Sequence, residues 1–227
     1  MPQAIGICQI LISKGAAINA IDSGEQTPLH RAVENGNLDI CQLLISKGAT
    51  IDAIYFGKTA PLHAAVKSKN LDIIQLLISK GATIDAVNSR KETPLLIASA
   101  TGNLNICQLL ISNGAAINAI DSAKKTALHR AVATRNIDIC QLLISKGAAI
   151  DNRLLEKFIR LWNEIRSAND IDDIPEEELC KICMNSPMNC VILECGHMMS
   201  CVECGGRLDD CPICRKTVVR VVRTFKA

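Results

Sequence analysis

Aromatic side chains are scarce in this sequence, whose 227 residues include one tryptophan, one tyrosine and three phenylalanines. A core must therefore be built from aliphatic residues and alanine, a composition typical of helical repeat arrays. An excess of one charge is also lacking, since 25 basic and 23 acidic side chains leave a net charge of +2. This near balance disfavours nucleic acid and anionic membrane surfaces as partners.

Long apolar runs and a secretory signal are missing as well. No stretch reaches the roughly 18 uninterrupted apolar residues of a membrane-spanning helix, because lysine, glutamine or asparagine interrupts every run. The first residues lack the early lysine or arginine of a signal peptide, and they recur downstream as part of a repeat. We therefore expect no membrane partner and a location in the cytoplasm or nucleus, where thiols stay reduced.

The twelve cysteines fall into two groups with different spacing. The first group, separated by 33, 66 and 33 residues, consists of Cys8, Cys41, Cys107 and Cys140. The other eight lie within the last 48 residues and include three C-x-x-C pairs. The regular spacing of the first group indicates core positions in a repeated unit, whereas the crowding of the second is typical of a metal site.

A period of 33 residues runs through the first two thirds of the chain. It is clearest in five glycines: Gly15, Gly48, Gly81, Gly114 and Gly147. Each full unit opens with a version of TPLH, and a threonine N-cap followed by proline predicts the start of a helix. A second apolar helix follows, and the periodic glycine after it predicts a left-handed C-cap. Each unit is therefore a helix pair.

These units resemble ankyrin repeats over residues 5 to 151, with four full units preceded by the second helix of a fifth. The resemblance implies a mostly α fold, a helical solenoid in which neighbouring repeats cover each other's apolar faces. It also implies a structural role for the histidine of TPLH, which ties neighbouring turns together. This histidine is present in three units, as His30, His63 and His129, and the remaining unit has Leu96 in its place. Because the chain begins inside a repeat, the array is either truncated or capped by a single helix.

Partner recognition in such an array depends on the residues that differ between units. At the hairpin tips three units carry short polar pairs, whereas the second carries Tyr55 and Phe56. In ankyrin repeats these tips line the concave binding surface, so the resemblance implies a protein substrate bound around Tyr55 and Phe56. The alternative is that both aromatic side chains fold over their own hairpin.

The 33-residue period ends at residue 151, and residues 152–179 form a connecting segment. Apolar residues recur there at helical spacing, which predicts one amphipathic helix; they are Leu154, Leu155, Phe158, Leu161, Trp162 and Ile165. We interpret this helix as a cap on the last ankyrin unit, and the alternative is a helix for self-association. Residues 167–179 carry six acids and no base, which predicts a solvated hinge.

Eight candidate zinc ligands follow in residues 180–227. They are Cys180, Cys183, Cys195, His197, Cys201, Cys204, Cys211 and Cys214. Eight donors suffice for two closed tetrahedral sites, which supply the stability that so short a segment cannot obtain from an apolar core. Closed sites without an open position argue against zinc-based hydrolysis.

The ligand spacing resembles that of a RING finger, a small α/β domain stabilised by zinc, in which ligand pairs interleave. The resemblance implies one zinc ion on Cys180, Cys183, Cys201 and Cys204, and a second on Cys195, His197, Cys211 and Cys214. The sequences ECGHMMSCVECGGRL and CPICRKTVVRVVRTFKA are similar to the RINGs of inhibitor-of-apoptosis proteins and of rififylin-type ubiquitin ligases.

In those RINGs a shallow apolar groove holds the ubiquitin-conjugating enzyme. The positions that match it here are Ile182, Leu208, Pro212 and Ile213. Arg215, directly after the last ligand, matches the arginine that bridges the conjugating enzyme and its ubiquitin. The remaining thiol, Cys190, lies in an apolar run with no base nearby in sequence, so we interpret it as a core thiol rather than a nucleophile.

The C-terminal segment 217–225 alternates β-branched and basic residues, which predicts a strand with one apolar face. In the inhibitor-of-apoptosis RINGs that it resembles, this strand builds a twofold interface. The terminal aromatic, here Phe225, then reaches the ubiquitin held by the partner protomer. The resemblance therefore implies a homodimer formed through the RING and its tail, with Phe225 acting in trans.

Together these patterns predict three segments: ankyrin repeats at 1–151, a capping helix and acidic hinge at 152–179, and a RING at 180–227. The function that the resemblance implies is a RING-type ubiquitin ligase with two zinc ions per chain and no covalent ubiquitin intermediate. The array recruits the substrate, and the RING positions a conjugating enzyme charged with ubiquitin. The alternative is a non-catalytic ankyrin scaffold that uses the RING only to dimerise.

Overall fold

The structure, a computed structural model, describes residues 2–55, 57–151, 153–154, 156–158, 160–161, 190–193, 198–201 and 221–223. The chain divides into two compact units, Met1–Thr126 and Ala127–Ala227. No helix within the described ranges is both long and apolar enough to cross a membrane. The segment borders predicted at 151 and 179 stay predictions.

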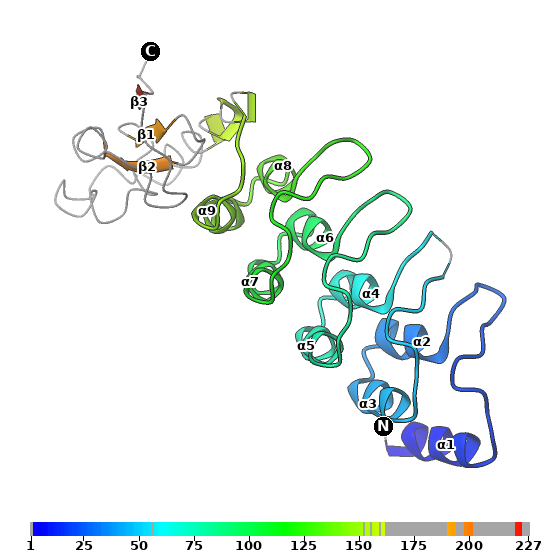
Figure 1. Ribbon diagram of the computed structural model, residues 1–227. Helices are drawn as coiled ribbons and strands as arrows, with labels where there is room; N and C mark the ends of the chain where they lie inside the picture. The colour runs from blue at the N-terminus through cyan, green and yellow to red at the C-terminus, as the bar shows by residue number, and fades with distance from the viewer. Residues whose placement is uncertain are drawn as a thin grey trace. The chain divides into compact units, whose positions relative to one another are not determined.

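The first unit contains a single helix, α1 (Pro2–Ser13), followed by helix pairs. The pairs are α2 (Pro28–Glu34) with α3 (Leu38–Ser46), α4 (Pro61–Lys67) with α5 (Leu71–Ser79), and α6 (Pro94–Ala100) with α7 (Leu104–Ser112). Helices α2, α4 and α6 pack in one row, while α1, α3, α5 and α7 form a second row (Figure 1). The predicted helix-pair organisation is confirmed.

The capping residues explain where these helices begin and end. Thr93 precedes Pro94 and accepts a hydrogen bond from the Leu96 amide over 3.3 Å, as the TPLH pattern predicts. Asparagines cap α5 and α7 in the same way, and the Asn70 side chain accepts from the Ile73 amide over 3.1 Å. At the C-terminal end Gly48 has φ of +90°, the left-handed conformation that a side chain would strain.

The core of the first unit is aliphatic, as the shortage of aromatics predicts. Buried residues recur at equivalent places in successive repeats: Leu29, Leu62 and Leu95 on first helices, and Leu44, Leu77 and Leu110 on second helices. Cys41, Ile74 and Cys107 are completely buried at another equivalent position. Burying such side chains contributes about 1.5–3 kcal/mol each, so packing between repeats accounts for most of the stability.

His30 and His63 are completely buried, and their hydrogen bonds show a structural role. The His63 Nδ1 atom accepts from the Ala60 amide over 3.2 Å. Its Nε2 atom therefore carries the proton of the neutral ring and donates to the Glu92 carbonyl in the next repeat over 3.0 Å. Burial lowers the pKa of both histidines below the ordinary value, which keeps the rings neutral. For His63 the predicted tie between repeats is confirmed.

The second unit begins with one more helix pair, α8 (Ala127–Ala133) and α9 (Ile137–Ser145), which pack against each other. Helical residues follow at 153–154, 156–158 and 160–161. Leu154, Phe158 and Leu161 are buried, whereas Arg153 and Arg160 are exposed, which confirms the amphipathic pattern. The Asp151 side chain caps this segment by accepting from the Leu154 amide over 2.7 Å.

A three-stranded sheet completes the described part of the second unit. Its strands are β1 (Cys190–Leu193), β2 (Met198–Cys201) and β3 (Val221–Arg223), in the order β2-β1-β3. Both pairings are antiparallel, and Ile192 lies opposite Met198 on one side and Val222 on the other. The strand predicted at 217–225 is confirmed for residues 221–223, and the remaining residues of that segment lie outside the described ranges.

The buried histidines predict how stability changes with pH. Their pKa is lowered in the folded state, so below pH 6.5 the unfolded chain binds more protons and the free energy of unfolding falls. The slope reaches at most about 1.4 kcal/mol per pH unit for each histidine. Replacing both by leucine, the residue at position 96, should flatten the profile between pH 5 and 7 in thermal denaturation. An unchanged slope would show that other groups control it.

Candidate functional site

The hairpin tips hold the residues that sequence reasoning assigned to substrate binding, and most of them support the hairpin itself. The Asp22 side chain accepts from the Gly24 and Gln26 amides over 2.8 and 3.0 Å. Asn88 and Asp121 accept from the amides two and four residues further along in the same way. These side chains shape the turn, which limits what they offer to a partner.

Tyr55 occupies the equivalent position in the second hairpin but makes different contacts. Its ring meets His30 edge-on, with 4.7 Å between the ring centroids and 74° between the planes. Its hydroxyl donates to the Glu34 carboxylate over 3.2 Å. Burial, and then the Glu34 charge, raises the pKa of Tyr55 above the ordinary value. Tyr55 is thus half-buried against the preceding repeat.

These contacts bear on the predicted substrate anchor. Tyr55 folds back, as in the alternative interpretation, although onto the α2 helix of the preceding repeat and not only over its own hairpin. Phe56 lies outside the described residues. The binding of a substrate around Tyr55 and Phe56 stays a prediction.

A polar cluster surrounds Tyr55 on the inner side of the first full repeat. The side-chain amide of Gln26 donates to the Glu34 carboxylate over 2.6 Å. The Arg31 guanidinium donates twice to the Asp22 carboxylate, over 2.9 and 2.7 Å. The Arg31 guanidinium holds the pKa of Asp22 below the ordinary value. The cluster holds two carboxylates and one guanidinium, so its charges are only partly balanced.

The cysteines of the array are not reactive groups. Burial raises the pKa of Cys41 and Cys140 to about 12 and that of Cys107 to about 11, so these thiols stay protonated at neutral pH. All three are completely buried, whereas Cys8 on α1 is half-buried. Thiolates are the nucleophilic and metal-binding form of cysteine, so the predicted structural role is confirmed for the buried three.

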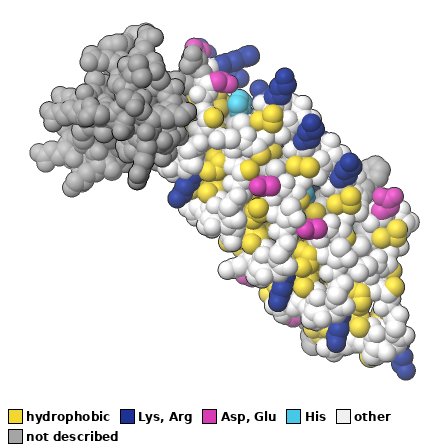
Figure 2. All heavy atoms as spheres, viewed as in Figure 1, with side chains coloured by type: hydrophobic (Ala, Val, Ile, Leu, Met, Phe, Trp, Pro, Cys, Tyr) yellow, Lys and Arg dark blue, Asp and Glu magenta, His cyan; other side chains and the backbone are white. Residues whose placement is uncertain are grey.

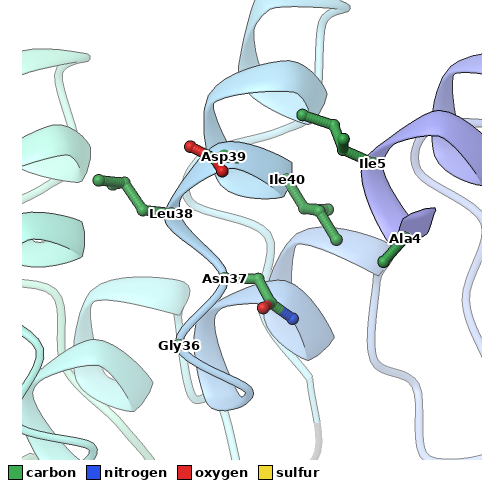
Figure 3. Close-up of a pocket in the computed structure, with 7 residues that line it drawn as sticks. All are labelled: Ala4, Ile5, Gly36, Asn37, Leu38, Asp39 and Ile40. Atoms are coloured by element: carbon green, nitrogen blue, oxygen red, sulfur yellow. The ribbon is translucent and has the colours of Figure 1, made fainter. Parts of the chain in front are cut away.

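A pocket of about 320 Å³ lies between α1 and the start of α3 (Figure 3). Ala4 and Ile5 line it from α1, and Asn37 and Ile40 line it from the other side. In the figure Ile40 points toward α1, whereas Leu38 points away from it. Asp39 is the one ionisable residue of the lining, so the pocket has no pair of groups for acid–base catalysis.

An exposed apolar position was missed by sequence reasoning. The residue before each hairpin tip is a β-branched aliphatic residue, exposed by 52–66%: Ile21, Ile54, Val87 and Ile120. Large apolar side chains at the same exposed place in four successive units cannot be explained by packing within a repeat. The 33-residue period contained part of this signal, because an apolar residue recurs at this position in four units.

The candidate zinc ligands lie almost entirely outside the described residues. Cys201, the last residue of β2, is described by its backbone and pairs in register with Cys190 of β1. The other seven ligands are not described: Cys180, Cys183, Cys195, His197, Cys204, Cys211 and Cys214. The same holds for the predicted contacts with the conjugating enzyme and its ubiquitin: Ile182, Leu208, Pro212, Ile213, Arg215 and Phe225. Within the described ranges no cluster of three or more potential metal ligands forms.

Comparison with known proteins gives relatives that are similar over a third of this chain or less. The chain is 51% identical over 65 residues to the E3 ubiquitin-protein ligase rififylin of Rattus norvegicus, covering 29% of this chain and 18% of the relative. It is 43% identical over 81 residues to the human E3 ubiquitin-protein ligase RNF34, covering 33% and 22%. Human baculoviral IAP repeat-containing protein 3 is 40% identical over 67 residues, covering 26% and 11%. The chain thus spans about a fifth or less of these relatives.

Two families match different parts of the chain. Residues 176–221 match the family described as zinc finger, C3HC4 type (RING finger), which implies zinc binding. Residues 3–55 and 62–153 match the family described as ankyrin repeats (3 copies), and they make up more than half of the chain. The glycine caps, the TPLH helix starts and the paired helices are features of these same residues. The chain therefore belongs to the ankyrin-repeat family and carries a C-terminal RING-type zinc finger.

Proposed function

We propose that this protein is a RING-type E3 ubiquitin ligase whose ankyrin array recruits a protein substrate. One observation carries the proposal: the RING match over residues 176–221 contains all eight zinc donors in sequence order. The most similar segments of rififylin and RNF34 belong to proteins named as E3 ubiquitin-protein ligases. The buried, protonated thiols of the array suit the reducing cytoplasm or nucleus, where we place the protein.

Zinc serves a structural purpose in this proposal. Cys180, Cys183, Cys201 and Cys204 would hold one ion, and Cys195, His197, Cys211 and Cys214 would hold the other. With four protein donors for each ion, neither would have an open position at which to activate water. In this proposal bound zinc would supply the stability of the segment that carries Ile182, Leu208, Pro212 and Ile213, the residues that we expect to contact the conjugating enzyme.

The chemical step takes place on the conjugating enzyme. A deprotonated substrate lysine attacks the thioester carbonyl carbon, a C–N bond forms, the C–S bond breaks, and the thiolate leaves on the conjugating enzyme. The proton of the amine passes to solvent. This chain contributes orientation, because Arg215 bridges the conjugating enzyme and its ubiquitin and holds the thioester ready for attack. Cys190 forms no covalent intermediate in this scheme, and its backbone lies within strand β1.

We further propose that the protein acts as a homodimer. The tail strand β3 pairs with β1 of its own chain. A twofold arrangement of two such sheets places each Phe225 against the ubiquitin bound to the partner protomer. The interface is isologous, so each dimer contains two equivalent composite sites.

The zinc content can be measured directly. Elemental analysis should return two zinc ions per chain, because eight donors form two tetrahedral sites. Chelation should unfold only the RING segment, because the fold of an ankyrin array does not depend on metal. Most of the helical circular dichroism signal should therefore survive. One zinc ion per chain, or a complete loss of helical signal on chelation, would contradict this account.

The ligase activity can be tested with ubiquitin-activating enzyme, ATP, ubiquitin and a panel of conjugating enzymes. The chain should build ubiquitin polymers on itself, and Arg215→Ala or Ile182→Ala should abolish them without changing the zinc content. If both variants retain full chain formation, the non-catalytic scaffold is the better description.

The same assay tests the dimer through complementation. Ile182→Ala lacks the docking groove but keeps its tail, whereas Phe225→Ala keeps the groove but lacks the tail. An equal, fully exchanged mixture contains half heterodimers, each with one intact site, so about a quarter of the wild-type activity should return. Size-exclusion chromatography must show that Phe225→Ala remains dimeric. A dimeric mixture without recovery would mean that Phe225 does not act in trans.

A further inference from the structure

The outer edge of the hairpins combines apolar and basic side chains in a regular order. Ile54, Val87 and Ile120 are exposed by 61%, 52% and 53%. Four residues after each of them stands an exposed lysine, so the six residues Ile54, Lys58, Val87, Lys91, Ile120 and Lys124 form what we call the hairpin ridge. Figure 2 shows basic side chains alternating with apolar ones along the edge where the hairpins of Figure 1 project.

Backbone hydrogen bonds connect the hairpins that carry the ridge. The Ser89 amide donates to the Gly57 carbonyl over 2.8 Å, and the Ser122 amide donates to the Arg90 carbonyl over 2.9 Å. Three consecutive hairpins are therefore joined to one another by backbone hydrogen bonds. A surface that is already ordered loses little conformational entropy when a partner binds.

The outward charge of the ridge is positive. Glu92 and Asp121 are buried and accept hydrogen bonds from their own hairpins. Asp52 and Asp85, at the base of the hairpins, accept from the backbone amides of Thr83 and Ala116 in the following repeats. Among the described residues, Lys58, Lys91 and Lys124 form no ion pair. The first hairpin differs, because Glu25 stands at the position of these lysines. The hairpin ridge thus carries positive charge, whereas the neighbouring first hairpin carries the negative charge of Glu25.

We propose that the hairpin ridge binds an extended acidic segment of a protein partner, with an apolar side chain at every third residue. Helices that pack side by side lie about 8–10 Å apart, so successive ridge residues have about this spacing. A polyproline II segment advances about 9 Å per three-residue turn, which brings every third side chain to the same face. Acidic residues between the apolar ones then face Lys58, Lys91 and Lys124.

A protein partner fits the ridge better than a nucleic acid. Single-stranded nucleic acids bind through aromatic stacking platforms, whereas the apolar ridge residues are aliphatic. The negative first hairpin also fixes the direction of the segment, because a basic residue at one end would lie near Glu25. A role of the ridge in selecting a ligase substrate rests on the proposed function. Its binding of an acidic segment does not.

The test measures binding of the full chain to a fluorescent peptide of four Leu-Asp-Glu triplets by fluorescence anisotropy. The variant Lys58→Glu/Lys91→Glu/Lys124→Glu should weaken binding at least about tenfold. Glutamate is compatible with this backbone, because Glu25 has φ of +60° and the lysines have φ between +54° and +56°. The variant Ile54→Ser/Val87→Ser/Ile120→Ser should weaken binding by a similar factor.

A matched control changes the same charges elsewhere. Lys14, Lys47 and Lys80 are exposed, recur with the same period, and stand at or just after the C-terminal ends of α1, α3 and α5. Their replacement by glutamate should leave peptide binding within about twofold, since the net charge changes equally but the ridge does not.

Several outcomes would overturn the proposal. One is that the wild-type chain does not bind the peptide at all, and another is that the control variant loses as much affinity for it as the ridge variant does. The wild-type chain could also bind a peptide of the same composition with clustered leucines, or an oligothymidylate of matched charge, as tightly as it binds the triplet peptide. The measurement needs no ubiquitin transfer. A chain that binds the peptide but builds no ubiquitin polymers would therefore contradict the ligase proposal and leave the ridge intact.

Discussion

The ties between consecutive repeats are the constraint on which the rest of the first unit depends. At the base of the hairpins the Asp52 carboxylate accepts from the Thr83 amide and hydroxyl, the latter over 2.6 Å. The His63 ring reaches the Glu92 carbonyl, and the hairpin backbones are joined at Gly57 and Ser89. These bonds hold each 33-residue unit in the same register. Side chains at equivalent positions therefore form rows, and a row of surface residues becomes a continuous binding surface.

Most of the fold could be predicted from the sequence because each rule involved is local or periodic. A left-handed glycine, a threonine cap and a buried aliphatic position depend on residues within one repeat, and the repetition confirms each of them several times. The environment of Tyr55 could not be predicted in this way. It depends on His30 and Glu34 of the preceding repeat, and no other unit combines an aromatic tip residue with a glutamate at that position.

The zinc region could be predicted from the sequence for a different reason. Few chemical groups bind zinc, and their C-x-x-C spacing is dictated by the tetrahedron, so the ligand set is visible without an alignment or a fold. The surface ridge had no such chemical signature. A single exposed isoleucine is ordinary in any protein, and only the exposed fractions at successive equivalent positions distinguish Ile54, Val87 and Ile120 from residues that pack inside a repeat.

The two halves of the chain perform separable tasks in this account: the array holds a partner by an ordered edge, and the RING holds a charged conjugating enzyme. A transfer assay tests the combination most directly. The substrate is a lysine-bearing carrier protein fused to the Leu-Asp-Glu segment, compared with the bare carrier. The account predicts that the wild-type chain ubiquitinates the fusion, and that the glutamate variant of Lys58, Lys91 and Lys124 modifies only itself. Equal modification of the fusion and the bare carrier, or of the fusion by both forms of the chain, would contradict it.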